Sequence, residues 1–337
     1  MQNLKNIVAK FPKARILVIG DLILDEYIWG SVDRISPEAP VPVVWANKST
    51  YVPGGAANVA YNIRSLDAKV SLVGVAGRDK NKEILFNELK KRRINTEGIF
   101  TQGERHTTLK TRILAGHQQV VRVDWENRDF LPAALNQKII QFVRRNINGF
   151  DAIVIEDYGK GVINIDLLRQ IIDVARKNNK IITVDPKEEH FQYYRKVTSI
   201  TPNRKELENA VRNIKIRDTT NRFKVHNDRL ASDKDIDLAA SSLLEYLELE
   251  SVLVTLGEQG MCLFERNRKP HHIPTVAQEV FDVSGAGDTV IATFTLGLCC
   301  RASKLEAAHL ANYAAGIVVG KVGTAVTDRR ELVKRLI

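Results

Sequence analysis

Short apolar runs alternate with helical patterns along most of this chain, and this alternation constrains the fold more than any other feature. The first run, residues 15–21, ends in Gly20-Asp21 and is typical of a buried parallel strand. Because the connections are short, the pattern predicts an α/β fold with a mostly parallel sheet covered by helices on both faces. Further strands are predicted over 69–76, 152–156, 180–185, 197–201 and 251–256, and helices over 56–66, 81–93, 133–146, 165–177 and 235–247.

Two segments, residues 41–52 and 107–124, break this rhythm with β-type alternation and no adjacent helix. They predict a small antiparallel sheet outside the main one. An exposed apolar strand face needs covering, either by its own domain or by a second copy of the chain, so a homodimer is one of two predicted arrangements. The very polar residues 213–235 predict an extended surface loop. The side chains that would form the apolar face are Val41, Val43, Trp45, Ile113, Val121 and Val123.

Residues 282–288 carry the strongest chemical signal. Gly285 and Gly287 leave backbone N–H groups unobstructed, and a helical pattern follows directly. Such amides form an anion site, because the unpaired N–H groups and the helix dipole both favour negative charge. A carboxylate beside a bound phosphate is unfavourable unless it has a task, and Asp288 is placed to take a proton from an attacking hydroxyl. The segment therefore predicts phosphoryl transfer.

Two other interpretations of this segment are open. Asp288 could simply cap the helix of a tight loop. Gly285 and Gly287 also begin the dinucleotide fingerprint Gly-x-Gly-x-x-Gly/Ala. However, Val290 occupies its third small position and no long buried strand precedes the glycines, so that fingerprint is not met.

The composition narrows the class of protein. With 337 residues and 44% hydrophobic content, the chain can bury a full core. No apolar run approaches the ~18 residues that span a bilayer, and the first residues lack the apolar region of a signal peptide. Cys262, Cys299 and Cys300 form no metal-ligand spacing, and no histidine pair is spaced as zinc ligands on a helix. This pattern predicts reduced thiols in a cytoplasmic protein.

The formal net charge of +10, from 50 basic and 40 acidic residues, is compatible with nucleic-acid binding. The basic residues are nevertheless dispersed or lie on helix faces, such as residues 90–93, and no nucleic-acid motif accompanies them. A positive field also suits an enzyme whose substrates are phosphorylated. We therefore expect neither a nucleic-acid nor a membrane partner.

Three motifs together resemble the PfkB/ribokinase family of sugar kinases. Residues 282–288 are similar to the family's second signature, residues 54–60 to its first, and residues 201–206 to its Asn-x-x-Glu motif. They occur in the family's order, and the resemblance covers nearly the whole chain. It implies a single PfkB-type kinase domain over 1–337 with a ribokinase-like three-layer α/β/α fold. It also implies a small β-lid from segments at about 26–52 and 103–126.

Four shorter stretches, residues 34–44, 118–124, 157–161 and 185–187, resemble one branch of that family, the bacterial heptose 7-phosphate kinases. The resemblance implies an ATP- and Mg²⁺-dependent enzyme that phosphorylates the anomeric hydroxyl of D-glycero-β-D-manno-heptose 7-phosphate. The product is the 1,7-bisphosphate, a precursor of ADP-heptose for the lipopolysaccharide core. Many bacteria fuse this kinase to an adenylyltransferase, but no His-x-Gly-His motif occurs here, so the resemblance is to the stand-alone form. The alternatives are a kinase for another sugar or sugar phosphate, and a non-catalytic sugar- or nucleotide-binding regulator on the same fold.

Roles for ATP and its metal follow. The amides of Gly285, Ala286 and Gly287 would hold the γ-phosphate as its charge redistributes. Asn203 and Glu206 lie at i and i+3 on one helix face, where a carboxylate suits Mg²⁺ through a water molecule. The resemblance assigns the remaining nucleotide contacts to Thr255, Gly257, Gly260 and Asn312.

The sugar is expected at the end of the first predicted strand, where ligands gather in open α/β sheets. Asp21 ends that strand, and Asn58 follows the close backbone approach that Gly54 and Gly55 permit. Asp25 is either a further ligand or a loop cap. A phosphorylated sugar also needs a cation, and the unranked candidates are Lys160, Lys187, Arg112 and Arg122.

Overall fold

The computed structural model describes residues 4–116, 118–218, 223, 225, 229–277 and 279–336. Within these residues the main sheet has nine strands in the order β13-β12-β11-β10-β9-β8-β1-β4-β5. Neighbouring strands from β11 to β5 are parallel, whereas β12 and β13 are antiparallel to their neighbours. The bounds are β1 (Arg15–Gly20), β4 (Lys69–Ala76), β5 (Asn95–Thr101), β8 (Ala152–Glu156), β9 (Ile181–Asp185), β10 (Ser199–Ile200), β11 (Ser251–Thr255), β12 (Met261–Glu265) and β13 (His271–Ile273).

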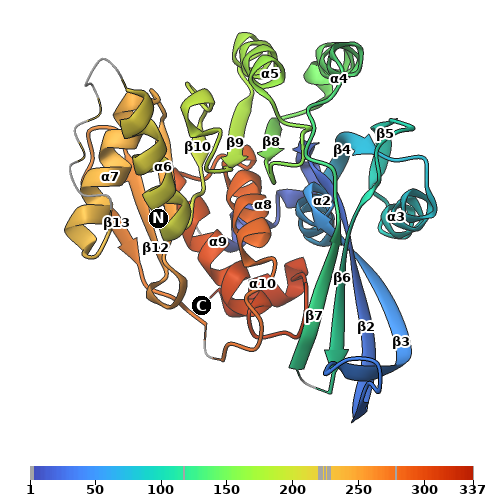
Figure 1. Ribbon diagram of the computed structural model, residues 1–337. Coiled ribbons are helices and arrows are strands. Elements are labelled where there is room, and N and C mark those ends of the chain that lie inside the picture. The colour runs from blue at the N-terminus through green and yellow to red at the C-terminus, as the bar shows by residue number, and fades with distance from the viewer. Residues whose placement is uncertain are drawn as a thin grey trace.

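Helices cover both faces of this sheet (Figure 1). Successive side chains of a strand point to opposite faces. In β1, Leu17 and Ile19 accordingly pack in the core that includes α4 to α7, whereas Ile16 and Val18 pack in the core that includes α2 and α8. The predicted sheet, mostly parallel and buried on both faces, is therefore confirmed. The helices are α1 (Leu4–Val8), α2 (Ala56–Ser65), α3 (Lys80–Lys91), α4 (Ala133–Asn146), α5 (Ile165–Lys177), α6 (Arg204–Arg217), α7 (Asp233–Tyr246), α8 (Ala286–Cys299), α9 (Lys304–Val318) and α10 (Arg329–Arg335).

The main-sheet strands and helices predicted by residue range all lie within two residues of observed ones. The polar loop predicted over 213–235 is shorter than expected. Helix α6 continues to Arg217 because Ile214 is buried against the core, and α7 already starts at Asp233. The rest of that prediction, at residues 219–222, 224 and 226–228, lies outside the described residues. Among the residues described, no helix combines the length and the apolar character needed to cross a membrane.

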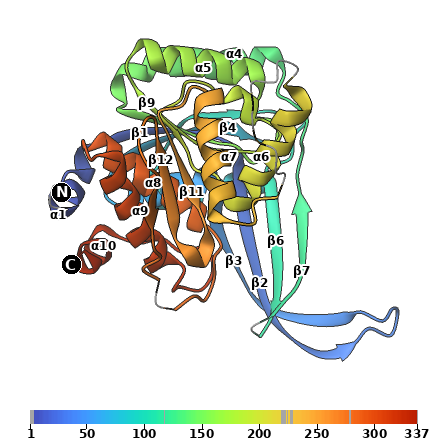
Figure 2. The ribbon, with the colours of Figure 1, turned by 90° about the vertical axis from the view of Figure 1, so that its left-hand side faces the viewer.

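A second sheet of four strands projects from the main body (Figures 1 and 2). The prediction of a purely antiparallel sheet is wrong at one pairing, because β2 and β6 run parallel. The parallel strands β1 and β5 end at the same edge of the main sheet, and β2 and β6 follow them, so both enter the second sheet from the same end. The order is β3-β2-β6-β7, with β2 (Leu22–Ile35), β3 (Pro42–Gly55), β6 (Thr108–Ala115) and β7 (Gln118–Trp125).

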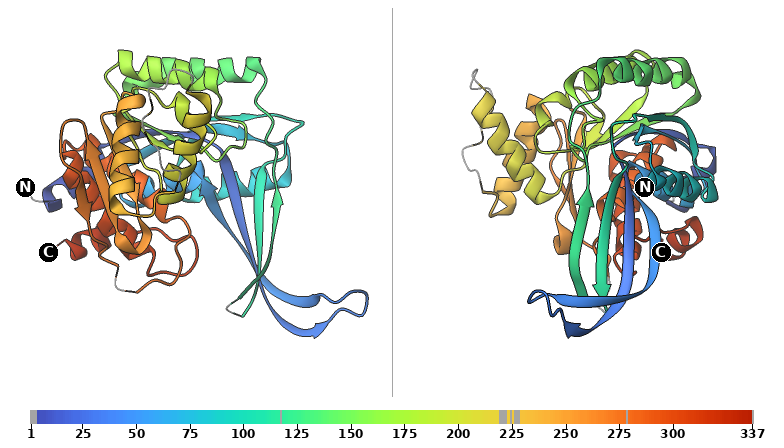
Figure 3. Two further views of the ribbon diagram at one scale, coloured as in Figure 1. Left: turned by 60° about the vertical axis from the view of Figure 1, so that its left-hand side comes forward. Right: turned by 45° about the vertical axis from the view of Figure 1, so that its right-hand side comes forward.

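The β2–β3 hairpin extends past β6 and β7, away from the main body (Figure 3). Near this end Ile35 and Trp45 are 61% and 67% exposed, and Val121 and Val123 on β7 are exposed as well. The single chain thus leaves these apolar side chains uncovered.

Candidate active site

The N-terminus of α8 has the geometry of an anion site. Gly285 precedes the helix with a φ of 77°, in the left-handed region that favours glycine, and an added Cβ would lie 2.9 Å from the Asn58 amide nitrogen. Ala286 donates its N–H to the carbonyl of Val283. The amides of Gly285 and Gly287 have no acceptor among the described residues and remain available to an anion. Of the three predicted amides, that of Ala286 is therefore used within the loop.

Asp288 lies in the first turn of α8 and is 4% exposed. Its carboxylate accepts hydrogen bonds from the side-chain amide of Asn58 at 2.5 Å and from the hydroxyl of Tyr158 at 3.2 Å. Burial raises its pKa to about 7, although both hydrogen bonds oppose the shift. No side chain caps the helix, so capping does not explain Asp288, and its pKa suits a general base near neutral pH.

The glycine pair before α2 brings a polar helix face against α8. Gly55 has a φ of 55°, and α2 begins directly after it. Asn58 reaches Asp288 from the first turn of α2, and one turn later Asn62 accepts a hydrogen bond from the Thr289 hydroxyl at 2.8 Å. Two segments more than 200 residues apart are thereby joined at the base of the site.

Two further carboxylates, which the sequence analysis did not assign to the site, lie beside Asp288. Glu156 ends β8 and Asp185 ends β9, and these adjacent parallel strands pair the two residues directly. One oxygen from each of the three carboxylates lies within 4.8 Å of the others. Glu156 is fully buried and accepts no hydrogen bond from a described donor. Burial and the neighbouring carboxylates raise the pKa of both Glu156 and Asp185 well above the ordinary range.

This cluster fits a divalent cation. The charge of Glu206 also raises the pKa of Asp185, so four carboxylates influence one small region. Buried carboxylates without cationic partners are strongly unfavourable, and a hard ion with oxygen ligands relieves their repulsion. An added Cβ on Gly287 would lie 3.8 Å from an Asp185 oxygen, so the cluster adjoins the glycine loop where a phosphate would bind.

Asn203 and Glu206 face each other at the start of α6, as their spacing predicted. Each accepts the backbone N–H of the other, Asn203 Oδ1 at 2.9 Å and Glu206 Oε2 at 2.8 Å, which forms a capping box. Thr255 donates its N–H to the carbonyl of Pro202, so this turn lies at the end of β11. The capping box uses one oxygen of Glu206, and the other makes no hydrogen bond to a described residue.

The turn after β11 and helix α9 provide the predicted nucleotide residues. Gly257 and Gly260 have φ values of 61° and 87°, and they turn the chain from β11 into β12. Asn312 on α9 is buried and donates its side-chain amide to the carbonyl of Pro274 at 2.8 Å. Asn312 therefore positions the segment after β13, and this donor is already engaged within the protein.

Asp21 holds the loop after β8. Its buried carboxylate accepts the backbone N–H groups of Tyr158 at 2.9 Å, Lys160 at 3.0 Å and Val162 at 3.1 Å. Burial raises its pKa to about 6. The carboxylate that was expected to bind the sugar thus fixes the loop that carries Tyr158, whose hydroxyl contacts Asp288.

Three of the four predicted phosphate-binding cations are paired with carboxylates. Arg112 pairs with Asp25 at 2.5 Å, and Asp25 lies directly against Gly54. Arg122 pairs with Asp124 at 2.8 Å on the exposed strand β7.

The other two predicted cations differ in their surroundings. Lys160 pairs with Glu126 at 2.5 Å, with both side chains largely buried. Lys187 is 35% exposed and reaches Glu188 and Glu189 only at 3.9 and 4.0 Å. The structure therefore separates one loosely paired cation from three that are tightly paired.

Lys110 is a basic residue that the sequence analysis missed. Its ammonium group lies 5.5 Å from the ring centroid of Tyr158, and burial lowers its pKa. Its positive charge also opposes the rise in the pKa of Asp288. Lys110 and Arg112 are two residues apart on β6 and so share one face of the sheet. The sequence signal that could have identified Lys110 is this spacing of two basic residues, two positions apart on a predicted strand.

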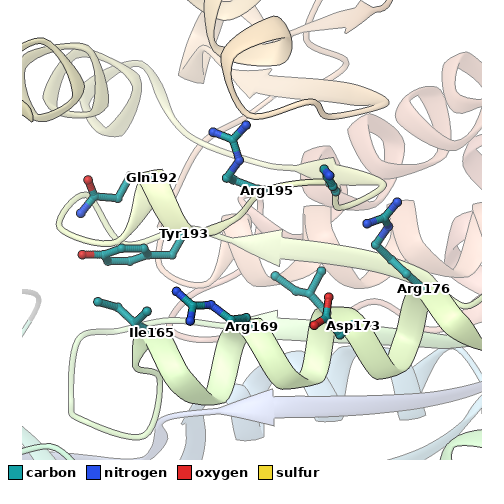
Figure 4. A pocket seen from close by; sticks show the side chains of 9 residues that line it. Ile165, Arg169, Asp173, Arg176, Gln192, Tyr193 and Arg195 are labelled. Carbon is teal, nitrogen blue, oxygen red and sulfur yellow. The ribbon is translucent and has the colours of Figure 1, made fainter. Parts of the chain in front are cut away.

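A hollow of about 260 Å³ lies elsewhere, between α5 and residues 192–196 (Figure 4). It is predominantly basic and contains none of the glycines or clustered carboxylates that surround Asp288, so it lacks the groups that phosphoryl transfer requires. The lining side chains are Ile165, Arg169, Ile172, Asp173, Arg176, Gln192, Tyr193, Arg195 and Lys196.

A three-layer α/β fold with a projecting β-sheet, a glycine anion site and a buried carboxylate beside it defines a phosphoryl-transferring enzyme. Residues 13–330 match the model of the pfkB family carbohydrate kinases, and the chain belongs to that family. It is an ATP-dependent carbohydrate kinase, and enzymes of this family use ATP with a divalent metal.

Curated relatives match this chain over most of its length. The chain is 42% identical over 329 residues to "Bifunctional protein HldE" of Desulfatibacillum aliphaticivorans, covering 98% of this chain and 64% of that protein. It is 44% identical over 318 residues to the protein of the same name from Helicobacter pylori strain HPAG1, covering 94% and 65%. The chain thus spans less than two thirds of the length of these relatives.

Two solved structures share the fold. Ribokinase of Arabidopsis thaliana in complex with ribose and ATP has a TM-score of 0.73 at 18% identity, covering 96% of this chain and 98% of that one. Phosphofructokinase-2 of Escherichia coli in complex with substrates and products has a TM-score of 0.76 at 20% identity, with the same coverage. The predicted ribokinase-like fold is confirmed.

Proposed function

We propose that this kinase transfers the γ-phosphate of ATP to the anomeric hydroxyl of D-glycero-β-D-manno-heptose 7-phosphate, giving the 1,7-bisphosphate for ADP-heptose synthesis. One observation carries the chemistry: Asp288 is buried at the start of α8, between free backbone amides and clustered carboxylates. The choice of sugar is supported by residues 34–44, 118–124, 157–161 and 185–187, which resemble the heptose 7-phosphate kinases. The identity with the HldE proteins over nearly the whole chain supports the same choice.

Asp288 would accept the proton of the attacking hydroxyl. Asn58 and Tyr158 fix its carboxylate, which lowers the entropic part of the barrier because the base is already oriented. The amides of Gly285 and Gly287, with the dipole of α8, would stabilise the charge of the transferred phosphoryl group.

Mg²⁺ is our proposal for the divalent ion that accompanies ATP. Glu206 would hold it through water, and Asp185 and Glu156 would add negative charge on its protein side. The ion would supply neutralisation of the β- and γ-phosphates. The protein side chains would then keep it next to the glycine loop.

The phosphate of the sugar would meet basic side chains of the second sheet and of the loop after β8. Arg112 and Lys160 already pair with Asp25 and Glu126, so a phosphate would compete with these carboxylates. Among the described residues, Lys110 makes no ion pair, and it joins the four predicted candidates.

The second sheet would act as a lid, and we propose that the lids of two chains cover each other. The exposed Ile35, Trp45, Val121 and Val123 support this arrangement, because exposed apolar side chains that gather on one projecting sheet are normally covered. Strand pairing places Trp45 on the face opposite to Val121 and Val123, so a partner chain would have to contact both faces to cover all four. The cysteines Cys262, Cys299 and Cys300 are free thiols, which suits a protein of the cytoplasm.

A panel of sugars tests the substrate. A site that encloses a phosphate leaves its cations unpaired when the phosphate is missing, so heptose 7-phosphate should exceed unphosphorylated heptose in kcat/KM by roughly 10³-fold or more. Fructose 6-phosphate should be poor because its anomeric hydroxyl is placed differently. The basic residue that binds the phosphate can be found by replacing single side chains. The variant at that position should lose activity with the phosphorylated sugar but not with the unphosphorylated one. The positions to replace are Lys110, Lys160, Lys187, Arg112 and Arg122.

The possible results separate the alternatives. Equal rates on ribose, fructose 6-phosphate and heptose 7-phosphate would reject the heptose while leaving the kinase class intact. Binding of a sugar without any ATP turnover would instead favour the non-catalytic regulator.

A further inference from the structure

Helix α7 packs on β12 near the edge of the main sheet that is farthest in strand order from β1 (Figures 1 and 2). Three side chains of types that can bind a metal, those of Cys262, His272 and Asp237, converge there. Cys262 and His272 are direct partners in the antiparallel β12–β13 ladder, so their side chains lie on the same face of the sheet. Asp237 of α7 meets them there. One ligand atom of each, the thiol sulfur, an imidazole nitrogen and a carboxylate oxygen, lies within 4.8 Å of the others.

These groups do not satisfy one another. The Oδ1 atom of Asp237 is buried and has no hydrogen-bond partner among the described residues. The Nε2 atom of His272 lies 3.6 Å from that oxygen, which is too long for a hydrogen bond. Cys262 is fully buried, and burial together with Asp237 raises its pKa to about 12. A buried carboxylate oxygen without a donor is unfavourable, and a cation among the three atoms would satisfy it.

We propose that Cys262, His272 and Asp237 form a binding site for Zn²⁺. Zinc prefers this mixture of sulfur, nitrogen and oxygen ligands, whereas Mg²⁺ avoids sulfur. Bonds of roughly 2.0–2.3 Å in a tetrahedron place ligand atoms about 3.3–3.8 Å apart. The separation of 3.6 Å between His272 and Asp237 already lies in that range.

The fourth position of the zinc ion would be taken by water. His272 and Asp237 have side chains that are 46% and 37% exposed, so the site is open to solvent on one side. Binding releases the thiol proton of Cys262 to solvent, because the thiolate is the ligand. The ion would clamp α7 onto the β12–β13 edge, directly before the segment that Asn312 holds.

The sequence gives no hint of this site, because its ligands stand at positions 237, 262 and 272, a spacing that matches no zinc motif. Strand pairing brings Cys262 and His272 together, and helix packing adds Asp237. The carboxylate cluster around Asp288 contains only oxygen ligands, so the two sites select different metals.

Cobalt titration of the metal-stripped full chain tests the proposal. Co²⁺ in a thiolate site produces a thiolate-to-cobalt charge-transfer absorption that an all-oxygen site cannot produce. We expect this absorption to saturate at one equivalent and to be displaced by Zn²⁺, with a higher Tm in the Zn²⁺ form. Cys262→Ala should abolish the absorption. His272→Gln should weaken binding by at least about 100-fold, since outer-shell changes alone reach 10–100-fold.

Matched variants separate ligation from general damage. His271→Gln changes the adjacent histidine, whose cross-strand partner is Leu263 and whose side chain lies on the other face, and it should leave the affinity unchanged. Cys299→Ser should do the same. His272 is partly exposed, so His272→Gln should fold normally. Absence of the absorption in the unaltered chain, its persistence in Cys262→Ala, or equal effects of the two histidine variants would each overturn the proposal.

Discussion

Two regions of the molecule differ in how their charges are balanced. One is the carboxylate cluster of Glu156, Asp185 and Asp288, and the other is the lid, formed by strands β2, β3, β6 and β7. In the carboxylate cluster, one oxygen from each of the three side chains lies within 4.8 Å of the others, and burial raises the pKa of each carboxylate. In the lid and its adjoining loop, Arg112 and Lys160 pair with Asp25 and Glu126, whereas Lys110 makes no ion pair among the described residues. The carboxylate cluster therefore holds negative charges without cationic partners, whereas the lid pairs part of its positive charge with its own carboxylates.

This difference indicates how binding proceeds in each region. At the carboxylate cluster, the proposed divalent ion that accompanies ATP would relieve a repulsion that the chain alone leaves unbalanced. In the lid, the proposed sugar phosphate would compete with the carboxylates that already pair with Arg112 and Lys160. Discrimination there would be a difference between two occupied states. We expect substitutions in or beside the carboxylate cluster to affect the chemical step, and substitutions in the lid to affect the choice of sugar and dimer formation.

The largest effect should come from Asp288→Asn. The amide keeps the shape of the side chain but cannot accept the hydroxyl proton, so kcat should fall by at least ~10²-fold while ATP and sugar still bind. Steady-state kinetics with calorimetric binding would measure both. Tyr158→Phe removes only the longer of the two hydrogen bonds to Asp288 and should cost far less. Near-normal turnover of pure Asp288→Asn would remove Asp288 from the mechanism.

The pH dependence should report the same carboxylate. Burial raises the pKa of Asp288 to about 7, and the base must be deprotonated to act, so kcat/KM should rise with pH and level off above that value. At one unit below the pKa the rate should be about tenfold lower than the plateau. A cation beside the carboxylate favours its charged form, so raising Mg²⁺ should move the midpoint to lower pH. A flat profile between pH 5 and 8 would contradict this assignment.

Local sequence patterns were sufficient for the strands, the helices and the residues of the glycine loops. The continuous apolar run of β1 and the positive φ values of Gly55 and Gly285 are properties of short segments, so short segments reveal them. Asn58, three residues after a glycine pair that begins a helix, could be expected near Asp288 for the same reason.

The contacts between segments were not predictable in this way. Glu156 and Asp185 meet because β8 and β9 are neighbours in register, and strand order is set by the packing of the whole chain. Asp21 was expected to bind the sugar, yet three backbone amides of the loop after β8 occupy its carboxylate. Lys110 becomes significant only because the lid folds back over Tyr158. Pairing, register and the distribution of hydrogen bonds require the tertiary structure.

A smaller effect should follow from breaking the proposed lid contact. If two lids cover each other, the protein is a dimer, and Trp45→Glu should weaken it by at least about tenfold through a buried unpaired charge. Sedimentation or light scattering over a concentration series would measure the dissociation constant. Ala46→Glu is the matched control, because exposed Ala46 pairs with Gly30 and Trp45 pairs with Ser31, so the two side chains lie on opposite faces of the same strand. A monomer at micromolar concentration in the unaltered chain would reject the lid dimer.

The smallest effect should come from Glu206→Gln, which tests whether Glu206 helps to hold the metal ion beside the carboxylate cluster. Glutamine can still accept the Asn203 N–H in the capping box, so the start of α6 should be preserved and only a charge is lost. One charge acting on a hydrated ion at about 4 Å is worth roughly 1 kcal/mol in water, so the Mg²⁺ concentration for half-maximal activity should rise about fivefold. Lys205→Gln, whose exposed side chain pairs with Glu208 at 3.4 Å, should leave the Mg²⁺ titration unchanged. If Glu206→Gln also leaves it unchanged at constant Tm, Glu206 serves the helix and not the metal.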